Sequence, residues 1–322
     1  MSEICLGIES TAHTFGIGIV DEEGNILYDE KSFYEPPVGE GLTPRKVFEY
    51  HAGNVGKIVK GAISREISVV AFSQGPGLPN CLSLGATIAR YLSLKLNLPL
   101  VGVNHCLAHI EIAKMLTKCK DPVVVYCSGG NTQILALVDG RYRIFGETLD
   151  IPIGNAFDML ARILGLSMPG GPKIEELAKS GKWVELPYVV KGMDFSFSGI
   201  VTECEKLCKK SVRKEDIAYS FQETCFSMIT EATERALAHT EKNEVLVTGG
   251  VAANRRFNEM LEIMCKDRGA KLYSVPIKYA GDNGVMIAWT GMKMFKTGIT
   301  TRLSESQIKK DWRVDEVDVK WT

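Results

Sequence analysis

The sequence predicts an α/β protein built from two similar halves that face each other across a cleft. The chain has 322 residues, of which 45% are hydrophobic and 24% charged. This length is too great for one ordinary core and suits two. The order strand, strand, strand, helix, strand, helix occurs twice along the chain. Polar turns that contain glycine follow strands in both halves, and such turns commonly border ligand sites.

The first half begins with three short strands. Patterns of apolar residues predict them at 4–11, 15–24 and 25–33. A helix is expected from Thr43, because Pro44 suits the first helical position and apolar residues then recur at helical spacing. The remaining elements of this half are a strand at 67–72, a helix at 81–96, a strand at 100–103 and a helix from 105.

The second half repeats this order. Three strands are expected at 122–131, 132–140 and 142–150. They are followed by helices at 155–164, 174–179 and 214–239, a strand at 244–250, a helix from Asn254, a strand at 271–275 and a helix from about Asp282. The duplicated order is that of two ribonuclease-H-like domains. It predicts the fold of actin, the sugar kinases and the heat-shock chaperones, in which a nucleotide binds in the cleft.

The domain boundaries follow from this repeat. We expect the first domain to span residues 1–118 and the second residues 119–296. The C-terminal segment, from about 297 to 322, is expected to pack back on the first domain.

Composition excludes several classes of protein. No apolar run approaches the ~18 residues that span a membrane, and the N-terminus, with Glu3 and no basic region, does not resemble a signal peptide. Nine cysteines without CxxC pairs indicate reduced thiols and a cytoplasmic location. The net charge of -1 means that a nucleic acid would be held only by local basic patches. One run, at 206–214, is either such a patch or a solvated helix end.

Three polar turns predict a phosphate-binding cleft. They are "GIESTAHT", "YCSGGNT" and "VTGGVAAN", and each follows a predicted strand. Backbone amides at such turns approach a phosphate closely, and the last turn runs into a helix N-terminus. In the first turn we expect Glu9, Ser10 and Thr11 to form a phosphate loop. Kinases and ATPases of this fold have an aspartate here, so the longer Glu9 disfavours ordinary ATP hydrolysis.

His105 and His109 form a candidate metal site. Residues four apart lie on one face of a helix, so the two imidazoles can converge on one ion, and Asp282 and Tyr126 are candidates for further ligands. The alternative is a helix capped by Asn104 with His109 hydrogen-bonded in the core. A zinc protease is excluded, because no glutamate lies between the two histidines.

These segments resemble a known family. The segments that carry the resemblance are "NHCLAHIEI", "YCSGGNTQ", "FGETLDIPIGNAFD", "PGGPKIEELA", "KGMDFSFSG", "YSFQET", "ERALAHT", "GGVAANRR" and "GDNGVMIAW". In this order they are similar to the archaeal and eukaryotic tRNA threonylcarbamoyladenosine transferases, formerly called O-sialoglycoprotein endopeptidases. These proteins are the catalytic subunits of the KEOPS complex. The resemblance extends from Ile4 to Trp321.

The resemblance implies an activity and its ligands. The expected reaction moves the threonylcarbamoyl group from threonylcarbamoyl-adenylate to the exocyclic amine of the adenosine 3′ of the anticodon, in tRNAs that read codons beginning with A. The expected cofactor is one divalent metal ion, iron rather than zinc, and ATP or another adenine nucleotide is also expected in the cleft. The metal ligands then fall on His105, His109, Tyr126 and Asp282. The substrate site falls on Tyr126, Cys127, Ser128, Gly129, Gly130, Asn131, Asp158, Gly171, Glu175 and Asn254.

Partners are implied as well. Besides tRNA they are a small atypical kinase, a small dimerising subunit on the helices of the N-terminal domain and a further subunit that binds the kinase. The alternative hypothesis is a nucleotide-gated ATPase or scaffold subunit of the actin fold in which the metal is purely structural.

Overall fold

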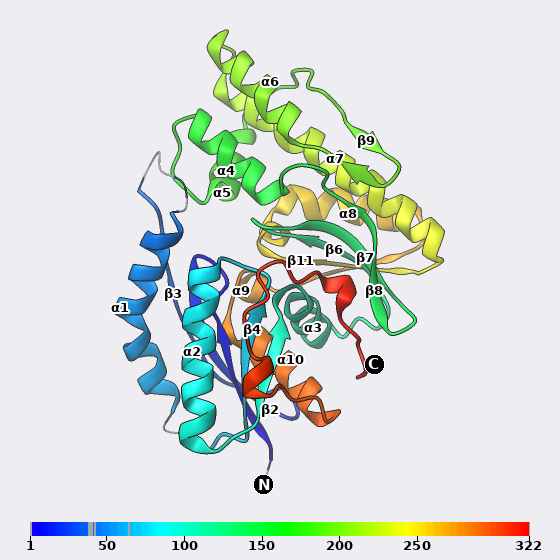
Figure 1. Ribbon diagram of the computed structural model, residues 1–322. Helices are drawn as coiled ribbons and strands as arrows, with labels where there is room; N and C mark the ends of the chain where they lie inside the picture. The colour runs from blue at the N-terminus through cyan, green and yellow to red at the C-terminus, as the bar shows by residue number, and fades with distance from the viewer. Residues whose placement is uncertain (1, 38–40, 42, 64, 322) are drawn as a thin grey trace.

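The computed structural model describes residues 2–37, 41, 43–63 and 65–321, and it contains two α/β units stacked one above the other (Figure 1). The first unit contains β1 (Ile4–Glu9), β2 (Thr14–Asp21), β3 (Ile26–Phe33), α1 (Pro44–Ala62), β4 (Val69–Gly75), α2 (Pro79–Leu96), β5 (Leu100–Asn104) and α3 (His105–Thr117). Its sheet has the strand order β3-β2-β1-β4-β5, with β2 antiparallel to its neighbours. Helices α1 and α2 lie against one face of this sheet.

The second unit repeats the topology. Its elements are β6 (Val123–Cys127), β7 (Thr132–Val138), β8 (Arg141–Glu147), α4 (Ile153–Ile163), α5 (Gly170–Ala178), β9 (Val190–Lys191), β10 (Asp194–Phe195), α6 (Ser198–Lys209), α7 (Lys214–Thr240), β11 (Glu244–Thr248), α8 (Arg255–Asp267), β12 (Lys271–Ser274) and α9 (Ile277–Ala280). The strand order β12-β11-β6-β7-β8 is that of the first sheet, with each strand replaced by its counterpart. The duplication expected from the sequence is therefore present in the structure.

The last long helix, α10 (Gly284–Lys296), packs on the first sheet and not on the second. Gly7 and Gly18, partners on β1 and β2, let the helix backbone rest directly on the strands. A Cβ added at Gly7 would lie 2.1 Å from the amide nitrogen of Ala288, and one at Gly18 would lie 2.2 Å from that of Val285. The expected domain boundary at 296 is wrong for this helix, because periodicity predicts a helix without saying which sheet it covers.

The C-terminal segment contacts both units. Thr301 donates its amide to the Leu100 carbonyl at 2.7 Å, and Lys309 donates its amide to the Gln74 carbonyl at 2.8 Å, so this part lies on the first unit. The segment then crosses the cleft, and Val319 donates its amide to Gly140 of the second unit at 2.8 Å. Beyond about residue 313 its valines are part of the second core. No helix among the described residues is long and apolar enough to cross a membrane.

Candidate active site

A cavity of about 1150 Å³ lies between the two units. Residues 11–14 line it from the first unit, residues 128–133 line it from the second, and residues 310–314 of the C-terminal segment close one side. Lys31 and Phe33 of β3 also face it. The carboxyl ends of the central strands of both sheets point toward this cavity. It therefore lies where α/β folds of this kind bind ligands.

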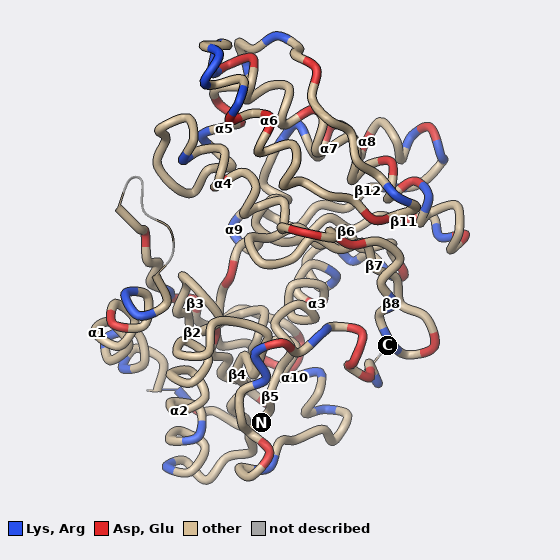
Figure 2. Tube along the Cα trace, turned by 45° about the horizontal axis from the view of Figure 1, so that its top comes forward, with Lys and Arg blue, Asp and Glu red and all other residues tan. Residues whose placement is uncertain are grey.

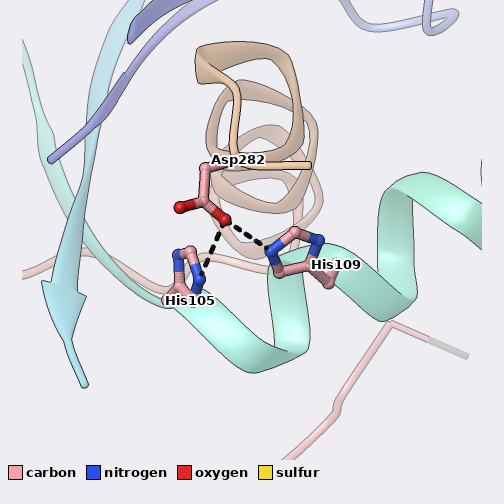
Figure 3. A group of neighbouring side chains, drawn as sticks. All are labelled: His105, His109 and Asp282. Carbon is pink, nitrogen blue, oxygen red and sulfur yellow. Dashed lines mark hydrogen bonds and ion pairs between the residues drawn. The ribbon is translucent and has the colours of Figure 1, made fainter. Parts of the chain in front are cut away.

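His105, His109 and Asp282 come together (Figure 3). His105 and Asp282 line the cavity, and His109 is fully buried beside them. Their ligand atoms all lie within 4.8 Å of one another. Asp282 Oδ1 is 3.1 Å from His109 Nε2 and 3.5 Å from His105 Nε2. The two histidines lie on the first turns of α3, and Asp282 precedes α10. The structure thus brings together three of the four expected metal ligands.

Helix capping fixes the backbone on both sides of this triad. The Asn104 side chain accepts the Leu107 amide at 3.1 Å and caps α3 immediately before His105. The Asn283 side chain accepts the Met286 amide at 2.9 Å and caps α10 immediately after Asp282. Asparagine is among the preferred N-cap residues because its side chain satisfies an otherwise unpaired helix amide. The expected cap at Asn104 is present, next to the cluster of His105, His109 and Asp282.

The three side chains of the triad differ in charge, and His105 must lose its proton before it can bind a metal ion. Burial lowers the pKa of His109 and so favours the neutral imidazole, the form that binds a metal ion. Although burial opposes it, the carboxylates of Glu9 and Asp282 raise the pKa of His105 to about 9. The neighbouring histidines hold the pKa of the Asp282 carboxyl well below its usual range, against the opposing effect of burial. Two imidazoles and one carboxylate with open positions form the donor set typical of non-haem iron(II).

Tyr126 lies beside the triad, at the end of β6. Its ring centroid is 5.3 Å from that of His109, and its hydroxyl is buried without a hydrogen-bond partner in the described part of the chain. Burial raises the pKa of this phenol well above its ordinary value. An unsatisfied buried hydroxyl costs free energy, which makes this oxygen available to an ion or ligand.

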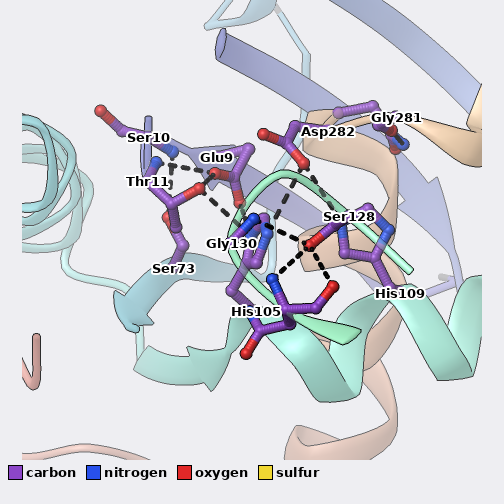
Figure 4. Close-up of polar contacts among 12 residues, drawn as sticks. Glu9, Ser10, Thr11, Ser73, His105, His109, Ser128, Gly130, Gly281 and Asp282 are labelled. Carbon is purple, nitrogen blue, oxygen red and sulfur yellow. Dashed lines mark hydrogen bonds and ion pairs between the residues drawn. The ribbon is translucent and has the colours of Figure 1, made fainter. Parts of the chain in front are cut away.

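The first polar turn does not have the form of a phosphate loop. Ser10 donates its amide to Ser73 Oγ at 2.9 Å, and Thr11 donates its amide to Glu9 Oε1 at 2.7 Å. Glu9 Oε2 contacts His105 Nδ1 at 2.9 Å, as the close-up in Figure 4 shows. The amides that would hold a phosphate are therefore already used, and Glu9 acts on His105. Sequence reasoning missed this because a turn sequence does not show which amides are paired.

The second polar turn borders open space. Added Cβ atoms at Gly129 and Gly130 would each meet nothing within 4 Å. Ser128 Oγ accepts the amides of Asn131 at 3.0 Å and Gly130 at 3.3 Å, which keeps the turn tight. Residues 128–131 of this turn all line the cavity, whereas Cys127 is fully buried.

The remaining expected site residues line the far wall of the cavity. Asp158 accepts the Gly170 amide through Oδ1 at 2.7 Å, which leaves its second oxygen for a ligand, and burial raises the pKa of this carboxyl. Glu175 Oε1 accepts the Arg255 amide at 2.8 Å at the start of α8. Gly171 also lines the cavity, and a Cβ there would meet nothing within 4 Å.

Asn254 is held by the protein itself. Its Oδ1 accepts the Phe257 amide at 3.0 Å, and its Nδ2 donates to Gln222 at 2.9 Å. It thus caps α8 at the edge of the cavity, with one amide hydrogen remaining for a ligand. Sequence reasoning also missed many other residues of the cavity lining, among them His13, Lys31, Phe33, Trp312 and Arg313.

Comparison with known proteins identifies the family. Residues 24–289 match the family model described as TsaD, tRNA N6-adenosine threonylcarbamoyltransferase. The curated protein of that name from Archaeoglobus fulgidus is 55% identical to this chain over 99% of both. The chain belongs to this family.

Two further relatives agree with this assignment. The tRNA N6-adenosine threonylcarbamoyltransferase of Thermococcus sibiricus is 52% identical over 99% of this chain and 100% of its own length. A probable bifunctional tRNA threonylcarbamoyladenosine biosynthesis protein of Methanocaldococcus jannaschii is 51% identical over 99% of this chain, which spans 60% of that protein. The enzyme class expected from the sequence, a transferase, is confirmed.

Solved structures confirm the fold class. Full-length HypF in its phosphate- and nucleotide-bound form aligns with a TM-score of 0.62 and 16% identity, covering 91% of this chain and 56% of that one. Component A of (R)-2-hydroxyglutaryl-CoA dehydratase from Acidaminococcus fermentans aligns with a TM-score of 0.52 and 15% identity. The alignment covers 91% of this chain and 98% of that one. At this identity the likeness shows the fold alone, and the fold is the expected actin-like one.

Proposed function

We propose that this chain transfers the threonylcarbamoyl group of threonylcarbamoyl-adenylate to the exocyclic amine of the adenosine 3′ of the anticodon, in tRNAs that read codons beginning with A. The convergence of His105, His109 and Asp282 beside a cleft with open glycine turns carries the proposal. The relatives described above are named for the same modification.

The triad would hold one divalent ion, iron rather than zinc. Two imidazoles and a carboxylate favour iron(II), and the hydroxyl of Tyr126, which has no hydrogen-bond partner among the described residues, would complete the donor set. The ion would supply Lewis-acid polarisation of an oxygen of the adenylate. Glu9 orients His105 through its Nδ1, as carboxylates do behind metal-ligating histidines.

The adenylate would lie along the wall formed by the second unit. The turn at 128–131 would border the space for its phosphate. No atom lies within 4 Å of where a Cβ would be at Gly129 or Gly130, so the phosphate could approach the backbone there. The free oxygen of Asp158 and the carboxylate of Glu175 would accept hydrogen bonds from ribose hydroxyls. ATP or another adenine nucleotide would fit the same wall.

The reaction needs little activation by the protein. The amine nitrogen forms a bond to the carbamoyl carbon, the bond from that carbon to the phosphate oxygen breaks, AMP leaves and the amine releases a proton. Because the mixed anhydride is already activated, the chain has to bind, orient and exclude water rather than create a strong nucleophile.

The proposal extends to partners and location. Lys and Arg are interspersed with Asp and Glu over both units (Figure 2), and Lys206 and Lys209 of the basic run pair with Glu203 and Glu205. Such a surface supports the sharing of tRNA binding with the kinase and the other KEOPS subunits.

An exposed apolar patch on α2 suits a protein partner. The exposed side chains of Tyr91 and Leu94 support the docking of the small dimerising subunit on the helices of the first unit. The free cysteines support a cytoplasmic location.

The test is a transfer assay. Threonylcarbamoyl-adenylate with labelled threonine is incubated with unmodified tRNA and iron-loaded protein, with and without partner subunits, and the nucleosides are analysed by mass spectrometry. We expect modified adenosine from the wild type and a loss of at least about 100-fold in His109→Ala. The control is His239→Ala, because that exposed histidine lies away from the cleft. Absence of product from the complete wild-type mixture would reject the transferase.

A further inference from the structure

The cleft has a wall that the proposed adenylate site does not use. Its volume of about 1150 Å³ exceeds the ~300–1,000 Å³ typical of a pocket for one small ligand. The groups assigned to the nucleotide come from the second unit. The opposite wall, next to the triad, contains residues 11–14 of the first unit together with Lys31 and Phe33 of β3. A second reactant therefore has room on this side.

Phe33 presents an aromatic surface to this space. It is the last residue of the edge strand β3, it lines the cavity, and 45% of its surface is exposed. The ring of His13 supports it, with a centroid separation of 5.2 Å and an interplanar angle of 58°. An aromatic ring left open on a cavity wall is suited to contact a planar ligand, because its π-face offers stacking area without conformational cost.

Lys31 places a cation next to this ring. It lies two residues before Phe33 on the same strand, and side chains at that spacing point to the same face of a sheet. Lys31 Nζ donates to the main-chain carbonyl of Asp282 at 3.0 Å, so the ammonium lies beside the metal triad. Lys31 is nevertheless exposed, so its other protons remain available to an anion.

We propose that Phe33 and Lys31, supported by His13, form the docking surface for the acceptor nucleotide of the RNA. The base of an unpaired loop nucleotide stacks on Phe33, and Lys31 pairs with an adjacent phosphate. The proposal rests on the proposed function, which makes an anticodon-loop adenosine the acceptor. An aromatic ring with a neighbouring cation is the combination that binds single-stranded bases, and loop bases are readily splayed out for such stacking.

The kinetic test uses three variants of Phe33. In Phe33→Ala and Phe33→Leu we expect the KM for tRNA to rise by about 5- to 150-fold, because each variant loses one base–aromatic stack. The KM for the adenylate should not change. Phe33→Leu keeps the apolar bulk, and Phe33→Trp, which restores a ring, should return the KM for tRNA toward the wild-type value. Trp183→Ala is the control, because that side chain is 57% exposed and does not line the cavity.

A binding measurement separates this surface from catalysis. A labelled anticodon stem–loop is titrated with the iron-loaded protein and followed by fluorescence anisotropy, and a fully paired duplex of equal length is the control RNA. We expect Phe33→Ala to weaken binding of the stem–loop by about 5- to 150-fold and to leave duplex binding unchanged. Circular dichroism melting checks that the variants are folded.

Two results would overturn the docking surface. One is wild-type affinity and wild-type KM for tRNA in both Phe33→Ala and Phe33→Leu. The other is a rise in the KM for the adenylate instead, which would assign Phe33 to the donor nucleotide. If the wild type binds the stem–loop through Phe33 but forms no modified adenosine, the proposed reaction fails and the docking surface stands.

Discussion

Glu9 Oε2 lies 2.9 Å from His105 Nδ1, and the other oxygen of the same carboxylate accepts the Thr11 amide at 2.7 Å. Glu9 is fully buried at the end of β1, so its carboxylate is fixed by the sheet and in turn fixes the imidazole. This contact directs His105 Nε2 toward Asp282, where the ligand atoms converge. Glu9 is therefore a positioning residue for the proposed metal site, and its effect can be measured as metal affinity.

Replacing Glu9 should weaken metal binding without unfolding the protein. Glu9→Gln keeps the shape of the side chain but removes the charge that orients and polarises His105. Loss of such a carboxylate typically lowers metal affinity by about 10- to 100-fold. The dissociation constant for Zn²⁺, measured by competition with a chelating dye, gives this change directly.

Thr11→Val is the matched control for Glu9→Gln. It removes the hydroxyl that donates to Glu9 Oε1 at 2.5 Å but leaves the contact from Glu9 to His105. We expect it to change the metal affinity by less than Glu9→Gln does. Equal affinities in Glu9→Gln and the wild type would show that Glu9 does not orient the ligand.

The sequence predicts the pair of histidines in the triad better than it predicts the residues that surround them. The spacing of His105 and His109 on a helix suffices to place two imidazoles together, because residues four apart share a helical face. The strand and helix order likewise predicts both sheets, since each element has its own apolar pattern. These features depend on residues close together in the sequence.

The role of Glu9 depends instead on contacts between distant segments. Its partner His105 is 96 positions further along the chain, and no local pattern reveals that contact. The same holds for Phe33 and Lys31, which look like ordinary residues of an exposed strand until the second unit faces them. Helix α6 was not expected, and α10 was assigned to the wrong unit, because tertiary packing and not periodicity decides both.

Gly18 should be required for the position of Asp282. A Cβ at this residue would lie 2.2 Å from the amide nitrogen of Val285, three residues after Asp282, so Gly18→Ala must push α10 away from the sheet. Overpacking of this kind costs about 1–3 kcal/mol, and the shift of Asp282 should also weaken metal binding. Urea denaturation and the dye competition assay measure the two effects.

Gly53→Ala is the control for this substitution. Gly53 lies inside α1, and a Cβ there would meet nothing within 4 Å. Alanine at such a helical position should stabilise the protein by about 0.5–1 kcal/mol and leave the metal affinity unchanged. Wild-type stability in Gly18→Ala would contradict the close packing of α10 on the sheet.

His51 should make the stability of the protein fall in mild acid. It is buried on α1, where Nε2 donates to the Ala12 carbonyl at 2.9 Å, and burial lowers the pKa of its imidazole. Below about pH 6.5, the ordinary pKa of histidine, the unfolded chain binds a proton that the folded protein does not. The free energy of unfolding contributed by His51 is thus fully present above that pH and is lost as the pH falls.

The pH effect of His51 can be isolated by substitution. Urea denaturation between pH 7 and pH 5 should show a slope that is smaller in His51→Gln than in the wild type, by at most about 1.4 kcal/mol per pH unit. His51→Gln keeps a donor for the Ala12 carbonyl but cannot be protonated. His239→Gln, at an exposed histidine, should keep the wild-type slope. The same slope in His51→Gln and the wild type would show that His51 titrates normally.

Metal ions should stabilise the folded protein, by an amount that grows with the logarithm of their concentration once the site is saturated. The ligand atoms of His105, His109 and Asp282 lie within 4.8 Å of one another only when α3 and α10 are in place, because Asp282 is 173 positions after His109 in the chain. An ion that binds this folded triad adds about 2.7 kcal/mol to the free energy of unfolding when its concentration is 100 times its dissociation constant. We therefore expect the melting temperature of chelator-treated protein to rise on titration with iron(II) or Zn²⁺. His109→Ala should abolish the rise and His239→Ala should not. A melting temperature that both ions leave unchanged in the wild type would mean that the triad is a hydrogen-bonded cluster and holds no ion.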